Sequence, residues 1–184
     1  MIDSMRQTFR RLAAETRGAE IAEAAAVLPL MFMMLLGIFW FGQAFSIYGA
    51  ITRAAQEGAR AGAVPYCATC SGTNLLSQYA SNAVTAVNTA LVASKLDPNQ
   101  IPIPTSAPVF IACTGGASSC NAVPGSNVCV QAPVQLTTPS SGGTGVCGIS
   151  VSFQYPFQFW LPFTSLNQKK MWLTASARVR METR

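Results

Sequence analysis

The chain has 184 residues and a formal charge of +5; half of the residues are hydrophobic, 10% are charged and none is histidine. An ordinary soluble domain has about a quarter of its residues charged. This composition excludes a typical soluble globular protein and any site that needs an imidazole, and the length leaves room for one modest domain beyond a membrane segment.

A basic N-terminal stretch precedes a long uncharged one. Residues 1–18 carry four arginines against Asp3 and Glu15, and no side chain from Ala24 to Thr52 is charged. A helix over that range is about 40 Å long, more than the roughly 30 Å of a bilayer's hydrocarbon core. Positive charge before a first membrane helix favours a cytoplasmic N-terminus. The sequence therefore predicts a single-pass membrane protein whose C-terminal part lies outside the cytoplasm.

Three interpretations apply to this N-terminal region. An uncleaved signal anchor fits the long apolar run, whereas a secretory or twin-arginine signal (Arg10 and Arg11) fits poorly, because its apolar run is about 7–15 residues. The third interpretation uses Glu23: if the chain is cut between Gly18 and Ala19, Glu23 becomes the fifth residue of the mature protein. This pattern resembles type IV prepilins, and the resemblance implies that Glu23 neutralises the N-terminal amine of a neighbouring subunit.

Further motifs resemble one family in particular. Between Arg17 and Ala63, the order and spacing of three stretches are similar to those of the TadE-like family: residues 27–30 (VLPL), 37–42 (GIFWFG) and 54–63 (AAQEGARAGA). Members of that family are minor pilins or pseudopilins of the Tad (tight adherence) secretion machinery. The resemblance implies a structural subunit of the bacterial inner membrane, or of the pilus itself, with a prepilin peptidase and the other Tad pilins as partners.

The first helix is expected to continue beyond the membrane until Pro65 ends it. Near that end, Gly58-x-x-x-Gly62 has the small-residue spacing that lets helices approach closely. This spacing indicates bundle packing in an assembled filament or pilus base; the alternative is a helix end frayed by glycine. Pro29 and the two glycines are the predicted helix-packing residues.

All six cysteines follow the membrane segment, and an even number in a non-cytoplasmic domain predicts disulfides. We expect neighbours in sequence to pair, among 15 possible connectivities. Zinc or redox chemistry at the Cys67-Ala68-Thr69-Cys70 motif is less favoured, because a zinc site needs a second such pair or histidines and a redox motif needs a strand before it. No metal or cofactor is predicted. The disulfide candidates are Cys67, Cys70, Cys113, Cys120, Cys129 and Cys147.

The remaining sequence changes from a helical to a strand-like pattern. Apolar residues recur at intervals of three and four from Leu75 to Leu91, which predicts an amphipathic helix that starts near Asn74 and is closed by Asp97-Pro98. Alternating residues predict three strands with one buried face each, at 128–136, 149–155 and 173–181, and 109–113 is a candidate fourth. The predicted fold class is α+β: a long transmembrane helix, a second amphipathic helix and an antiparallel sheet of three to four strands.

An uncharged aromatic stretch from Tyr155 to Phe163 separates the last two predicted strands, and Lys169 and Lys170 follow it. It either packs into the core and covers the end of the sheet, or forms an exposed patch that contacts lipid headgroups or another pilin.

The chemistry expected of an enzyme is missing from the sequence. After Pro65 the only acids are Asp97 and Glu182, so no nucleophile–base pair is found, and the scattered basic residues form no nucleic-acid-binding stripe. Two hypotheses remain: a minor pilin of a Tad-type pilus that acts in adhesion or secretion, or an uncleaved membrane-anchored binding module outside the cytoplasm. The expected organisation is a leader (1–18), a helix (19–64) and a disulfide-bonded periplasmic or extracellular domain (65–184).

Overall fold

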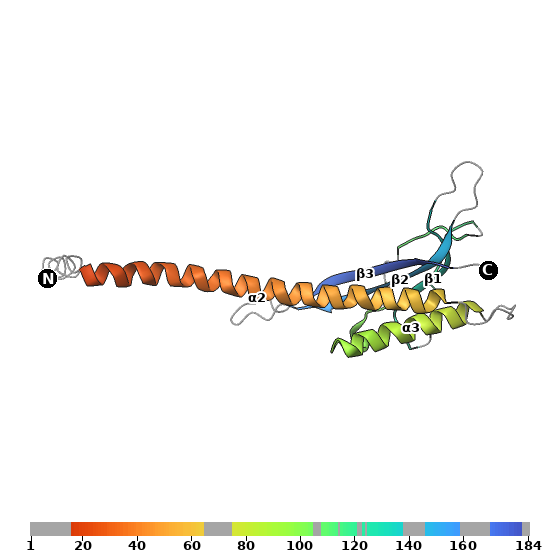
Figure 1. Ribbon diagram of the computed structural model, residues 1–184, viewed down its shortest axis with the longest axis horizontal. Helices are drawn as coiled ribbons and strands as arrows, with labels where there is room; N and C mark the ends of the chain where they lie inside the picture. The colour runs from red at the N-terminus through yellow and green to blue at the C-terminus, as the bar shows by residue number, and fades with distance from the viewer. Residues whose placement is uncertain are drawn as a thin grey trace. The chain divides into compact units, whose positions relative to one another are not determined.

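Over the residues that it describes, the computed structural model contains two long helices and a three-stranded antiparallel sheet (Figure 1). The predicted α+β class is confirmed. The elements are α2 (Thr16–Ala63), α3 (Leu75–Ala93), the 3₁₀ helix η1 (Pro98–Gln100), β1 (Cys129–Gln135), β2 (Cys147–Phe157) and β3 (Met171–Arg180). The structure describes residues 16–64, 75–104, 108–113, 115–120, 123, 125–137, 146–158 and 170–181, without the side chains of 16–20 and 75–76.

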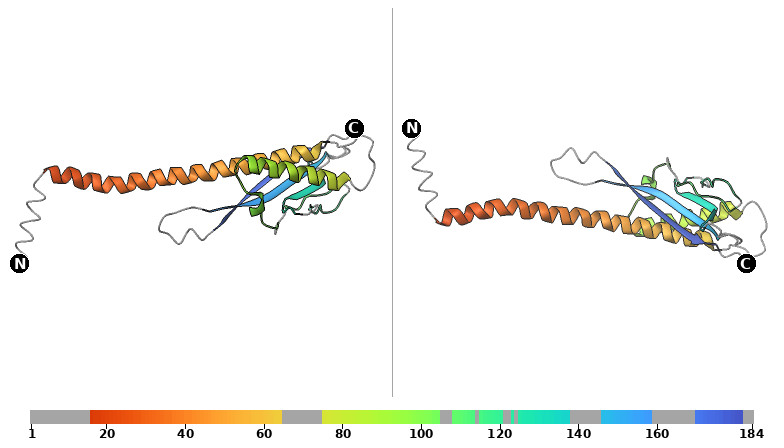
Figure 2. Two further views of the ribbon diagram at one scale, coloured as in Figure 1. Left: turned by 90° about the horizontal axis from the view of Figure 1, so that it is seen from below. Right: turned by 90° about the horizontal axis from the view of Figure 1, so that it is seen from above.

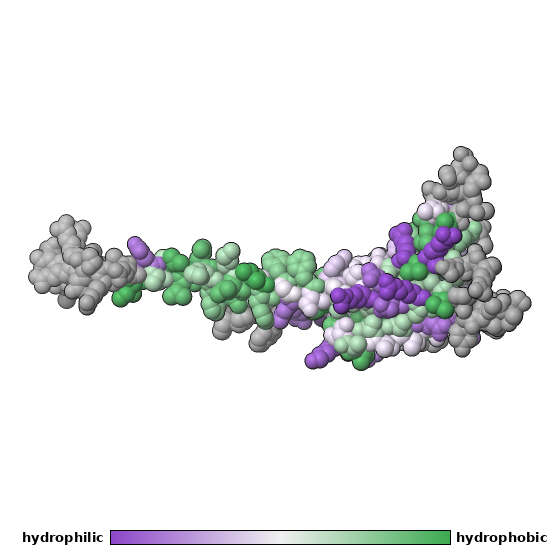
Figure 3. All heavy atoms as spheres, in the orientation of Figure 1, coloured by the Kyte–Doolittle hydropathy of each residue, from purple (hydrophilic) through white to green (hydrophobic). Residues whose placement is uncertain are grey.

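The chain forms two compact units, residues 1–44 and 45–184, and the boundary falls inside α2. In the first unit the apolar side chains of α2 are exposed, for example Leu30 at 72% and Met33 at 75%, and they give this part of the helix its hydrophobic surface in Figure 3. Ile21–Ala63 is long and apolar enough to cross a membrane, the one such helix among the described residues. A helix satisfies its own backbone groups, so these apolar side chains are suited to face lipid. Pro29 lies inside α2 without ending it.

The core of the second unit lies between the C-terminal turns of α2, α3 and one face of the sheet (Figure 2). On α2 the buried positions are mostly small residues, which lets α3 and the sheet approach its backbone. On α3 the predicted apolar stripe is confirmed. The buried apolar side chains include Ile51, Ala54, Ala55 and Ala59 from α2, Ala83, Val87 and Leu91 from α3, and Val130, Ile149, Val151 and Phe153 from the strands.

The end of α3 differs from the prediction. The helix stops at Ala93, and Lys95 adopts a positive φ of 59°. The N–H of Leu96 then donates to the carbonyl of Leu91 (2.9 Å), the pattern that closes a helix around a left-handed residue. Asp97 does not close α3; it caps η1 instead, where its side chain accepts from the N–H of Asn99 (3.0 Å).

The sheet has the order β1-β2-β3 with antiparallel pairs, and its strands match the predicted ranges to within two residues at each end. Cross-strand partners on the helix-facing side are apolar, as in the row Val130, Val151 and Ala177. The prediction of one buried face holds for β3 but is wrong for β1 and β2. Ser150 and Ser152, on the other face of β2, are 1% and 3% exposed.

This second face is buried because described residues between η1 and β1 lie across it; residues 108–113 and 115–120 are called the covering segment below. The side-chain amide of Gln131 donates to the carbonyl of Pro108 (3.0 Å), and the Arg178 guanidinium lies 4.1 Å from the centroid of the Phe110 ring. The predicted fourth strand at 109–113 is wrong. Its residues form isolated bridges, Ile111 with Ala117 and Ala112 with Val134, rather than a strand.

Two disulfides hold this covering segment to the sheet. They join Cys113 to Cys147 and Cys120 to Cys129, with Cα–Cα distances of 6.0 and 5.0 Å. The presence of disulfides is therefore confirmed. The expected pairing of sequence neighbours holds for Cys120 and Cys129, which are consecutive cysteines, and is wrong for Cys113 and Cys147. Cys67 and Cys70 lie outside the described residues.

Candidate functional site

The described part of the chain contains no cluster of three or more His, Cys, Asp or Glu side chains that could hold a metal ion. The residues singled out by the sequence lie along α2 instead. They fall into two groups: the start of the helix, around Glu23, and its packing surface in the second unit, around Gly58 and Gly62.

The predicted cleavage position, Gly18 and Ala19, lies in the first turn of α2, which begins at Thr16. Glu23 follows Ala19 by four residues, so the two share one side of the helix at a separation of about 6 Å along its axis. The Glu23 side chain is exposed. Among the side chains that the structure describes it has no ion-pair partner. The carboxylate is therefore accessible to a cation supplied from outside the chain.

The two glycines near the end of α2 mark the closest approach in the second unit. A Cβ on Gly62 would lie 2.5 Å from Cδ1 of Ile149, 3.1 Å from Cβ of Ala83 and 3.2 Å from the carbonyl oxygen of Tyr79. Both Gly62 and Gly58 are buried. The absence of a side chain at these positions is what lets α2 rest on α3 and β2.

Gly58 makes the same kind of contact one turn earlier. A Cβ there would overlap Cγ2 of Val87 and lie 3.1 Å from the carbonyl oxygen of Ala83. The close approach predicted for the glycine pair is thus made within the chain, to α3 and β2. The helix end is not frayed there, since α2 remains helical to Ala63. Bundle packing between subunits stays a prediction.

The opposite side of these last turns of α2 is polar and open. Arg53, Gln56, Glu57 and Arg60 are exposed, and Nη1 of Arg60 donates to Oε1 of Glu57 at 3.2 Å. This charged side, rather than the glycine side, is the part of α2 in the second unit that another protein can reach. An exposed pair of this kind contributes well under 1 kcal/mol to stability.

The aromatic stretch begins inside the core. Tyr155 and Phe157 are buried in β2, at 4% and 5% exposure, which confirms core packing for these two residues; residues 159–163 lie outside the described part. The Tyr155 hydroxyl accepts the backbone N–H of Asp97 at 3.2 Å and so ties η1 to the sheet. Burial raises the pKa of Tyr155 above its usual value; the hydrogen bond from the Asp97 backbone lowers it, and the Asp97 charge raises it.

Sequence reasoning missed a cavity at this same end of the sheet. It is lined by residues of η1, the end of β2 and the start of β3, namely Gln100, Pro156, Gln158, Lys170 and Trp172. One signal for it was present in the sequence, the pair of lysines that follows the aromatic stretch, of which Lys170 is the second. The sequence contains no indication that η1 would bring Gln100 to the same place.

Together these features define a single-pass membrane protein: an apolar helix long enough to cross a bilayer, and a disulfide-bonded α+β unit built around its C-terminal turns. The family model described as TadE-like protein matches residues 18–60, which confirms the resemblance predicted from the motifs of that region. No curated protein and no solved structure matches the chain.

The TadE-like match implies a pilin-like protein associated with Tad pili, in a family that is structural rather than enzymatic. The matched residues all lie in α2, from Gly18 in its first turn to Arg60. The helix α3, the covering segment and the sheet lie outside the matched range.

Proposed function

We propose that the chain is a minor pilin or pseudopilin of a Tad-type pilus, cleaved by a prepilin peptidase between Gly18 and Ala19 and incorporated through its N-terminal helix. The observation that carries this proposal is the family match over residues 18–60, which starts at the proposed cleavage position and includes Glu23. The function it supports is assembly of a pilus that acts in adhesion or secretion.

The orientation follows from charge and from the disulfides. The basic residues before α2 favour retention in the cytoplasm, where a prepilin peptidase would act. Disulfides persist outside the reducing cytoplasm, so the bonds Cys113–Cys147 and Cys120–Cys129 support a periplasmic or extracellular position for the second unit. Residues 1–18 then form a leader, residues 19–64 the anchoring helix and residues 65–184 the exported domain.

Glu23 is the residue through which we expect subunits to join. A carboxylate at the edge of an uncharged membrane helix is costly unless it is paired. Cleavage after Gly18 creates an α-ammonium at Ala19, and the same group on a neighbouring subunit would neutralise the exposed Glu23 carboxylate. Breaking one partner of such a partly desolvated pair costs about 3–5 kcal/mol.

The test is co-purification of the tagged full-length chain with the other Tad pilins from detergent-solubilised membranes. Glu23→Gln is expected to reach the membrane at wild-type levels, because an amide at that position enters the bilayer at least as easily as a carboxylate. It should recover far less of the partner pilins. Glu57→Gln is the matched control, since its exposed pair with Arg60 contributes little. If Glu23→Gln recovers as much partner as wild type, Glu23 does not join subunits and the anchored binding-module alternative gains.

A further inference from the structure

The two edges of the sheet differ in how their backbone groups are paired. β1 and β3 are the outer strands of the order β1-β2-β3, on opposite sides of β2 (Figure 2). At the β1 edge, the N–H of Gln135 donates to the carbonyl of Ile111 (2.8 Å), and the N–H of Cys113 donates to the carbonyl of Pro133 (3.2 Å). The covering segment therefore bonds to the edge of β1.

The register of β3 shows which of its backbone groups point away from β2. The N–H of Met181 donates to the carbonyl of Cys147 (3.1 Å), and the antiparallel pairing with β2 continues without a shift along the whole of β3. In an antiparallel pair, successive residues point their N–H and C=O groups alternately toward the neighbouring strand and away from it. The odd-numbered residues of β3 therefore bond to β2, and the even-numbered residues point outward.

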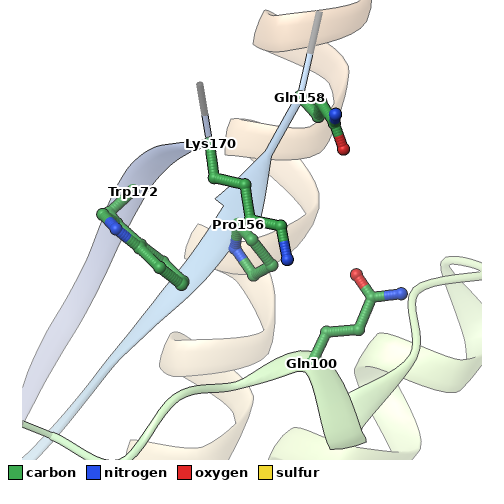
Figure 4. A pocket seen from close by; sticks show the side chains of 5 residues that line it. All are labelled: Gln100, Pro156, Gln158, Lys170 and Trp172. Carbon is green, nitrogen blue, oxygen red and sulfur yellow. The ribbon is translucent and has the colours of Figure 1, made fainter. Parts of the chain in front are cut away.

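The outward-pointing residues form an open edge. Trp172 is left out of it, because Trp172 lines the cavity at the start of β3 (Figure 4). The others are exposed, and among the described residues no loop or strand bonds to their backbone groups. The edge is about 20 Å long and contains neither proline nor a β-bulge, two features that prevent strands from pairing at an edge. The open edge consists of Thr174, Ser176, Arg178 and Arg180.

The charge at the open edge is of one sign. β3 has no acidic residue, and among the described residues neither Arg178 nor Arg180 has an ion-pair partner. The contact of Arg178 with the Phe110 ring, at 4.1 Å, holds the guanidinium in place without neutralising it. From residue 169 to residue 184 the sequence has five basic residues and one acid, Glu182. Opposite charges on facing strands stabilise a sheet, so a strand added here is favoured by carboxylates beside the arginines.

The other face of an added strand would meet apolar side chains. Leu173, Ala177 and Val179 alternate with the residues of the open edge, and they are partly buried where they pack against the core. Apolar side chains beside them on an added strand would remove their remaining surface from water. The favoured partner therefore has one acidic face and one apolar face.

A second copy of this chain does not supply such a strand. β1, β2 and β3 contain no aspartate or glutamate. Pairing of β3 with β3 of a second copy would bring four arginines to one junction without a strand carboxylate to compensate them. The partner is thus a different protein.

We propose that β3 accepts a fourth, antiparallel strand from another protein, an extended acidic segment that bonds to the open edge. The N–H and C=O groups of Ser176 and Arg178 pair with its backbone. Its carboxylates lie beside Arg178 and Arg180, and its apolar side chains extend the core beside Ala177. The open edge lies within the second unit. The proposal rests neither on cleavage nor on pilus assembly, so its test can fail independently of the proposed function.

The probe is a capped, fluorescein-labelled peptide of about nine residues in which valine alternates with glutamate. Fluorescence anisotropy measures its binding to the full chain in an uncharged detergent. We expect saturable binding, and we expect binding weaker by about tenfold for the same peptide with lysine in place of glutamate. Absence of binding, or equal binding of the two peptides, would overturn the proposal.

Ser176→Pro tests the backbone pairing. Proline removes an outward N–H, and an edge strand tolerates this because the lost group is not part of the ladder with β2. The variant should bind the glutamate peptide about tenfold more weakly, whereas Ser176→Thr keeps the N–H and should bind it as wild type does. A folded Ser176→Pro protein that binds as tightly as wild type would contradict strand addition.

Arg180→Glu tests the charge without a change in the backbone, and as an exposed substitution it keeps the test decisive if Ser176→Pro fails to fold. It should weaken binding of the glutamate peptide by about fivefold and strengthen binding of the lysine peptide. Lys95→Glu is the matched control. It makes the same change in net charge just after α3, which contacts β1 at the other edge of the sheet, and should leave both affinities unchanged. Equal effects of the two substitutions would show attraction by net charge alone and overturn the proposal.

Discussion

Gly62 brings α2 so close to β2 that a Cβ at this position would lie 2.5 Å from Cδ1 of Ile149. The Ile149 methyl can move, but the Cβ of Ala83 and the carbonyl oxygen of Tyr79, at 3.1 and 3.2 Å, are fixed by the backbone of α3. The packing of α2 against α3 and β2 therefore depends on the absence of a side chain at Gly62.

Gly62→Ala is expected to destabilise the second unit by about 1–3 kcal/mol, the usual cost of overpacking a core. Gly49→Ala is the control, because a Cβ at Gly49 meets nothing within 4 Å and alanine is the better helix former by up to about 1 kcal/mol. Denaturant unfolding of the detergent-solubilised chain measures both. Equal midpoints for the two variants would contradict the packing described here.

The disulfide connectivity gives a second prediction. Peptide mapping of the unreduced protein should recover Cys113 linked to Cys147 and Cys120 linked to Cys129. In the chain-entropy model, the bridge with a sequence separation of 34 contributes about 4 kcal/mol and the one with a separation of 9 about 3 kcal/mol. Replacement of both cysteines of a pair by alanine should thus lower stability more for Cys113 and Cys147. Recovery of a Cys113–Cys120 peptide would show that the arrangement is wrong.

Tyr155 gives a prediction about pH. Because burial raises its pKa, the folded state favours the neutral phenol. That contribution is complete below the unfolded pKa of about 10 and is lost as the pH rises through the higher folded value. The stability difference between wild type and Tyr155→Phe should therefore be constant at neutral pH and shift against wild type in alkali. Urea unfolding of both proteins up to about pH 12 checks this, and a difference that stays constant over the whole range would rule it out.

The elements of the fold were predictable where one local pattern decides the outcome. The uncharged run from Ala24 to Thr52 predicts the membrane helix, and alternation between apolar and polar residues predicts the three strands. The same rule failed for Ser150 and Ser152, because alternation identifies the apolar face and cannot show that a distant segment covers the polar one.

The bond between Cys113 and Cys147 could not be predicted, for a related reason. Ala112 bridges Val134, and Val134 pairs with Gly148, so three segments distant in sequence lie side by side. That alignment places Cys113 next to Cys147. The spacing of the cysteines along the sequence does not indicate this alignment. The cavity was missed likewise, since Gln100 reaches Lys170 and Trp172 only through the placement of η1 against the sheet.

At the candidate site, the sequence identified Gly18 and Glu23 through their spacing alone, and the structure adds the exposure of the Glu23 side chain. The roles proposed for both depend on a peptidase and a neighbouring subunit. Both partners are separate molecules, so these roles are tested by experiments that include the peptidase and the neighbouring subunit.

The mass of the mature chain, isolated from cells that express the Tad apparatus, tests the central claim most directly. The wild-type protein should begin at Ala19, whereas Gly18→Val should accumulate as the uncut precursor, because a side chain next to the scissile bond hinders the peptidase. Gly49→Val, at an open position of α2, should be cut normally. A wild-type mass that still includes residues 1–18 in the presence of active peptidase would contradict the account.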